Sequence, residues 1–175
     1  MEDGRVLGID PGERRVGLAV SDALRLIASP LQVLPRGRDL GPTLEAIARI
    51  AREERAVQIV VGYPINADGS IGPQARRSEE FARRLGAVLA LPMQLWDERL
   101  SSAGAEEALR ANGRDLRRAR QRGELDAYAA AVMLQDYLDA ARLARTRAAN
   151  LAALESRTRD DAVRLGQHDL SGSGA

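Results

Sequence analysis

The chain has 175 residues, of which 26 are basic and 25 acidic, with a formal net charge of +1 at pH 7. This length allows one domain with a sizeable core and an appendage, and the absence of cysteine excludes disulfide bonds and thiolate metal sites. No apolar run reaches the roughly 18 residues that a membrane span requires, so we expect a cytoplasmic protein with no membrane partner.

The first predicted elements are two short strands, residues 6–9 and 16–20, on either side of a Pro-Gly turn. Asp10 ends the first strand. A carboxylate at the end of an apolar strand costs free energy unless a cation, a hydrogen-bond donor or water meets it. Gly8 and Gly12 would let backbone or a ligand approach it. Asp10 is therefore our first candidate site residue, and the alternative is an ordinary aspartate at the start of a turn.

The following stretches predict an α/β fold with a mixed sheet of about five strands. Pro30 interrupts the third strand, which we place toward an edge of an antiparallel meander. The remaining elements alternate between helix and strand, as in βαβ units, and give a sheet ordered 3-2-1-4-5. The expected ranges are a strand over 26–34, a helix from 41, a strand over 57–62, a helix over 74–90 and a strand over 93–96.

Two further carboxylates are placed to join Asp10. Glu98 directly follows the last predicted strand, and Asp126 lies in the first turn of an alanine-rich helix that begins near Glu124. The helix dipole also favours a carboxylate at that position, which is the structural alternative for Asp126. Because the strand ends open on one side of the sheet and the alanines permit close approach of the helix, we expect all three carboxylates to meet there.

Such a cluster, with no cysteine and with the sole histidine in the tail, forms a hard oxygen site. Hard oxygen sites favour Mg²⁺ or Mn²⁺ over Zn²⁺. Two such cations, about 4 Å apart, can activate water and stabilise the leaving oxygen of a phosphodiester. The pattern therefore favours a metal-dependent nuclease with two ions.

Four blocks of sequence resemble the YqgF family, also called RuvX, whose members are RNase H-like proteins related to the RuvC Holliday junction resolvases. The blocks are Gly8-x-Asp10-x-Gly12-x-x-Arg15-Val16-Gly17-x-Ala19, Gly62-x-Pro64, Asp97-Glu98-Arg99-Leu100-Ser101-Ser102 and Asp126-x-x-Ala129-Ala130 with Leu134-Gln135. They span about residues 5 to 140 in the family's order. The resemblance implies an RNase H-like fold.

The resemblance also implies roles for particular residues. The family's catalytic and metal-binding carboxylates correspond to Asp10, Glu98 and Asp126, and Arg15 and Arg99 match family arginines that would meet a phosphate or orient a carboxylate. Ser102 stands where the family commonly has threonine, which keeps the hydroxyl group.

The function implied is that of a cytoplasmic bacterial nuclease that matures the 5′ end of pre-16S ribosomal RNA. The alternative is a resolvase or DNA nuclease acting on branched DNA in recombination and repair, for which we expect a symmetric homodimer. A second alternative is a non-catalytic nucleic-acid-binding module in transcription. Sugar-kinase and actin-type ATPases share the first strand-Asp-x-Gly-strand pattern, but the chain shows no second phosphate loop or adenosine motif.

Every basic residue is arginine, whose planar guanidinium binds phosphate through two parallel hydrogen bonds. Where arginines cluster we expect contacts with a nucleic-acid backbone, although a charge run can also be a solvated face. Besides Arg15 and Arg99, the candidates are Arg76, Arg77, Arg114, Arg117, Arg118, Arg120 and Arg122.

The composition changes from about residue 142, where arginine, alanine, aspartate and serine dominate. We therefore expect a nuclease domain over residues 1–141 and, over 142–175, a helical extension to about residue 154 and a C-terminal tail whose final ten or so residues are disordered.

Overall fold

The computed structural model describes residues 4–97 and 124–168, with side chains described as far as Leu154. Within these residues the chain forms a five-stranded sheet in the order β3-β2-β1-β4-β5. This is the predicted order. The strands are β1 (Arg5–Asp10), β2 (Arg15–Ser21), β3 (Ala28–Pro35), β4 (Ala56–Tyr63) and β5 (Met93–Asp97).

The sheet is mixed, as predicted. β1, β2 and β3 pair antiparallel, whereas β4 pairs parallel with both β1 and β5. Pro30 lies in edge strand β3, where a missing backbone donor is tolerated. The C-terminal ends of the three parallel strands therefore meet at one edge of the sheet, which is where open α/β sheets place their ligands.

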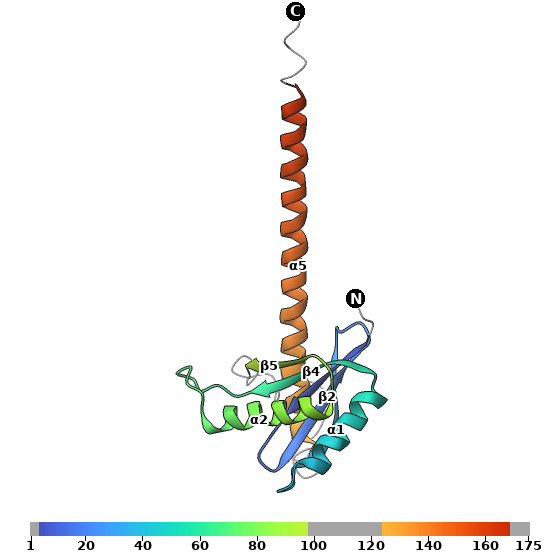
Figure 1. Cartoon of the computed structure of the whole chain (residues 1–175), viewed down its shortest axis with the longest axis vertical. Coiled ribbons are helices and arrows are strands. Elements are labelled where there is room, and N and C mark those ends of the chain that lie inside the picture. Colours follow the sequence, from blue (N-terminus) through green and yellow to red (C-terminus); the bar gives the residue numbers. More distant parts are fainter. Residues whose placement is uncertain (1–3, 98–123, 169–175) are drawn as a thin grey trace, which may run out of the picture. The chain divides into compact units, whose positions relative to one another are not determined.

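Two helices, α1 (Gly41–Glu53) and α2 (Pro73–Val88), pack on one face of the sheet (Figure 1). Each has a proline at its first or second helical position, where the missing N–H costs nothing. Their apolar faces bury the sheet side chains that point toward them, among them Leu7, Ile9 and Ile59, none of which is exposed to solvent. This layer is the main hydrophobic core.

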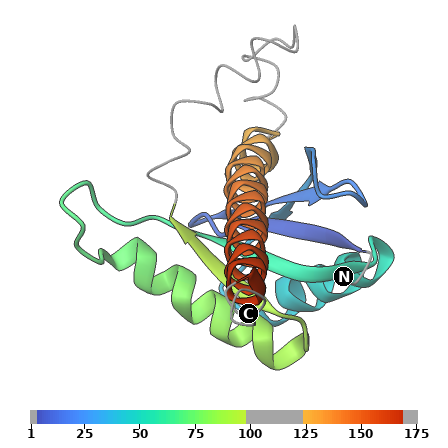
Figure 2. The ribbon, with the colours of Figure 1, turned by 90° about the horizontal axis from the view of Figure 1, so that it is seen from above.

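The first turns of α5 (Leu125–His168) pack on the opposite face of the sheet (Figure 2). Side chains alternate along a strand, so Gly8 and Asp10 face this helix while Leu7 and Ile9 face the core. A Cβ atom on Gly8 would lie 2.9 Å from the Cβ of Leu134. The missing side chain of Gly8 and the alanines of the helix let α5 approach closely, as the alanine run predicted.

The side chain of Gln135 attaches α5 to the chain entering β3. Its Nε2 donates to the carbonyl of Leu26 at 2.9 Å, and its Oε1 accepts from the backbone N–H of Ala28 at 2.8 Å. The amide thus satisfies two backbone groups at once, much as a neighbouring strand would.

We expect Gln135→Ala to lower the free energy of unfolding by about 1 kcal/mol, because two hydrogen bonds to partly exposed backbone groups are lost and water replaces them. Denaturant unfolding would measure the change against Gln74→Ala, at an exposed position in α2. Equal stability of the two variants would contradict this role for Gln135.

The chain divides into two compact units, Met1–Leu138 and Asp139–Ala175. In the second unit α5 continues to His168, beyond the end near residue 154 that we expected. Leu143 and Leu151 are exposed, and helix propensity together with local pairs such as Arg142 with Asp139 supports the helix in this region. The domain boundary at residue 141 and a disordered tail stay predictions. None of the described helices combines the length and apolar character of a membrane span.

Candidate active site

Asp10, the last residue of β1, lies partly buried on the face of the sheet that α5 covers. Burial raises the pKa of the Asp10 carboxyl to about 6, and the negative charge of Asp126 contributes to the rise. At neutral pH this carboxylate is therefore ionised, and its burial and the nearby negative charge make the ionised form cost free energy. A cation beside the two carboxylates would relieve that cost.

Gly17 explains how Asp126 reaches this position. Gly17 on β2 is the register partner of Asp10 on β1. A Cβ atom on Gly17 would overlap the carbonyl oxygen of Asp126, so the backbone of the first turn of α5 lies directly on this glycine. In the sequence, Gly17 stands out only as part of the first family block. In the structure it is the place where the helix contacts the sheet next to Asp10.

Arg15, at the start of β2, is the basic residue of this site. Its Nη1 lies 3.8 Å from Oδ2 of Asp126, and its side chain is about half exposed, at 54%. An exposed ion pair of this length contributes little to stability. The guanidinium thus remains accessible to a phosphate while it lies beside the carboxylate.

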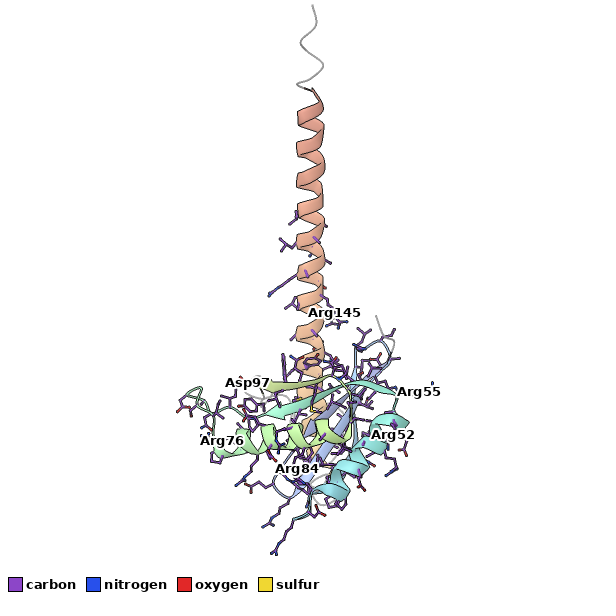
Figure 3. All side chains as sticks on the ribbon, in the orientation of Figure 1. Arg52, Arg55, Arg76, Arg84, Asp97 and Arg145 are labelled. Atoms are coloured by element: carbon purple, nitrogen blue, oxygen red, sulfur yellow. The ribbon has the colours of Figure 1, made fainter. Side chains whose placement is uncertain are left out.

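The predicted third carboxylate, Glu98, lies outside the described residues, as do Arg99, Arg114, Arg117, Arg118, Arg120 and Arg122. The structure does describe Asp97, at the end of β5 and in register with Tyr63 of β4 (Figure 3). Among the described side chains, those of residues 4–97 and 124–154, no three histidine, aspartate or glutamate residues are grouped so that they could hold a metal ion. Of the predicted site residues, the structure brings Asp10, Asp126 and Arg15 together.

The two predicted arginines of α2 lie in its first turns, on the surface. Arg77 forms an ion pair with Glu13, which belongs to the turn between β1 and β2. Arg76 donates to the carbonyl of Ile71 at 3.4 Å, at the start of the helix (Figure 3). The structure thus brings Arg77 to the turn that follows Asp10, and it places Arg76 beside the loop before α2.

One residue of this region could not be identified from the sequence. Nη1 of Arg36 donates to the carbonyls of Pro11 and Gly12, at 3.1 and 2.9 Å. No spacing or motif signals this contact, because it depends on which carbonyls the folded turn presents to the end of β3.

A family model described as "RuvX: Holliday junction resolvase" matches residues 4–140. The chain belongs to the RuvX family. A protein of Anaeromyxobacter sp. strain K, named "Putative pre-16S rRNA nuclease", is 48% identical over 135 residues, which cover 77% of this chain and 96% of that protein. A protein of Chloroflexus aggregans with the same name is 44% identical over 145 residues, which cover 81% of this chain and 98% of that protein.

A solved structure of the fowlpox virus resolvase with Holliday junction DNA has the same fold, at a TM-score of 0.50 and 8% identity, over 78% of this chain and 97% of that chain. This confirms the RNase H-like architecture of the RuvX family member described here. The family match ends at residue 140, so most of the second unit lies beyond it.

Proposed function

We propose that this chain is a divalent-metal-dependent nuclease that hydrolyses phosphodiester bonds and processes the 5′ end of pre-16S ribosomal RNA. Membership of the RuvX family and the shared name of its relatives support this substrate. The observation that carries the proposal is the pair of carboxylates Asp10 and Asp126. They come from distant parts of the sequence, and Gly17 allows them to meet beside one strand end.

The donor chemistry of the pair fits Mg²⁺ or Mn²⁺. Two carboxylates whose mutual repulsion and burial raise the pKa of one of them form the kind of site that a hard cation stabilises. Asp10 and Asp126 would hold the metal, and Glu98 is the predicted third ligand of what we expect to be two ions. When bound, such ions supply an activated water and stabilise charge on the leaving oxygen.

The protein's own side chains supply the rest. The ionised carboxylates of Asp10 and Asp126 fix the site at the end of β1. Arg15, beside Asp126, is placed to neutralise and orient a phosphate of the substrate. Arg77 and Arg76 extend the positive charge along α2. There they would bind backbone phosphates of the nucleic acid at some distance from the bond that is cleaved.

The second candidate function is resolution of Holliday junctions. The description of the family model and the fold shared with the fowlpox virus resolvase favour it. Cutting two strands symmetrically requires two active sites related by a two-fold axis. Sedimentation that finds only monomer at high protein concentration would argue against this function.

The test compares a labelled pre-16S RNA fragment with a four-way DNA junction, in Mg²⁺ or Mn²⁺. The proteins are the wild type, Asp126→Asn and the control Glu45→Gln, which removes an exposed carboxylate on α1. We expect the wild type and the control to cleave the RNA. The cleavage rate of Asp126→Asn should be lower by about 100-fold or more, because replacing even a residue that only supports a metal ligand lowers activity by up to about 100-fold.

Preferential cleavage of the junction would instead establish the resolvase function. If wild type and Asp126→Asn bind both substrates equally and cleave neither, the chain is a binding module, as in our second alternative.

A further inference from the structure

We propose that Arg36 is a positioning residue, which holds the turn between β1 and β2 and thereby fixes Asp10 and Arg15 at the two ends of that turn. The inference rests on the proposed nuclease function. Arg36 follows the end of β3 directly and belongs to none of the sequence blocks that define the site.

The contacts of Arg36 converge on the turn. Its Nη1 donates to the carbonyls of Pro11 and Gly12, at 3.1 and 2.9 Å. Its backbone N–H donates to the carbonyl of Arg14 at 2.9 Å and so extends the pairing of β2 and β3 by one step. Three carbonyls of a short turn therefore accept hydrogen bonds from one residue.

The other side of the guanidinium rests on the hydrophobic core. The guanidinium carbon of Arg36 lies 5.6 Å from the centroid of the Phe81 ring, a cation–π distance. Phe81 belongs to α2 and is fully buried. The guanidinium of Arg36 therefore lies between the turn, whose carbonyls it binds, and a buried side chain of the hydrophobic core.

The charge around Arg36 favours positioning over direct contact with substrate. Burial lowers the pKa of Arg36 and the neighbouring Arg77 lowers it further, whereas Glu13 opposes them. Arg77 in turn pairs with Glu13 of the same turn. Arg36 is half-buried, and its Nη1 is engaged by two carbonyls, while Arg77 is exposed and better placed for a phosphate.

Three variants separate the possible roles. Arg36→Met keeps an unbranched, apolar stem at this position but removes the guanidinium, and with it the charge and every side-chain donor. Arg36→Lys keeps a cation that can donate to both carbonyls from one nitrogen. Arg38→Met is the matched control, because Arg38 is exposed on the same segment.

The readouts are hydrogen exchange of the amides from Gly12 to Arg15, and kcat and KM for the RNA substrate. In Arg36→Met we expect these amides to exchange about 10-fold faster and kcat to fall by about 10-fold or more with KM nearly unchanged, since displaced catalytic groups cost turnover rather than binding. Arg36→Lys should return both the exchange rates and kcat most of the way to the wild-type values, and Arg38→Met should match the wild type in both.

Unchanged exchange in Arg36→Met would overturn the proposal. So would a raised KM with an unchanged kcat, which would make Arg36 a contact of the substrate. If the wild type cleaves neither substrate, the proposed function fails, and the exchange rates still decide by themselves whether Arg36 holds the turn.

Discussion

Replacing Asp10 with Asn is expected to stabilise the metal-free protein at pH 8 and to abolish cleavage. The ordinary pKa of an aspartate carboxyl is 3.8, and in the folded protein burial and Asp126 raise the pKa of Asp10 to about 6. Between these values the folded protein binds more protons than the unfolded chain. The free energy of unfolding therefore falls as the pH rises from about 4 to 6, and the contribution present below pH 4 is lost above pH 6.

The difference in pKa corresponds to roughly 1 to 3 kcal/mol in the free energy of unfolding. The wild type loses this stability as the pH rises, whereas Asp10→Asn keeps it because the asparagine side chain cannot ionise. Unfolding in a chelator across pH 4 to 8 would measure the effect. The wild type should lose stability through this window relative to Asp10→Asn, and Glu45→Gln should follow the wild type. Parallel pH profiles for wild type and Asp10→Asn would contradict the burial of an ionised carboxylate here.

Adding Mn²⁺ should make the wild type more stable than Asp10→Asn, the reverse of their order without metal. A cation that binds only the folded state stabilises it by mass action, and Asp10→Asn lacks one of the ligands. The same residue would thus lower the stability of the metal-free protein and create the site that binds the metal. Such an opposition between stability and activity is typical of a catalytic carboxylate.

The second large effect is expected for Gly17→Ala. The added Cβ would overlap the carbonyl oxygen of Asp126, and β2 lies between two other strands, so the first turn of α5 must move. We expect a loss of about 1 to 3 kcal/mol of stability from overpacking, together with a loss of cleavage as Asp126 leaves Asp10.

Gly86→Ala is the matched control for this variant. Gly86 lies within α2, and a Cβ there would meet nothing within 4 Å. Alanine should be neutral or stabilise the helix by up to about 1 kcal/mol. If Gly17→Ala behaves like Gly86→Ala in both unfolding and cleavage, the start of α5 does not depend on Gly17.

The fold could be predicted because its signals are local. Short strands on either side of a Pro-Gly turn indicate a meander, and an apolar run such as residues 57–62 indicates a buried parallel strand. Together they predicted the observed sheet order. The length of α5 was underestimated, because the change in composition after residue 142 led us to expect its end near residue 154, whereas the helix continues to His168.

The site was predictable only in part. Asp10 ends a strand, and Asp126 lies at the start of a helix whose alanines permit close packing, and both facts are visible in the sequence. The contacts of Gly17, Arg36 and Gln135 are not, because they join backbone groups whose positions depend on the completed fold. Glu98 stays a prediction.

The affinity for Mn²⁺, measured by titration calorimetry without any nucleic acid, tests the proposed metal centre most directly. The proteins are the wild type, Asp10→Asn, Asp126→Asn and the control Glu45→Gln. We expect the wild type and Glu45→Gln to bind Mn²⁺ alike and each aspartate variant to bind about 10-fold or more weakly. Equal affinity in all four proteins would show that Asp10 and Asp126 do not form the metal centre.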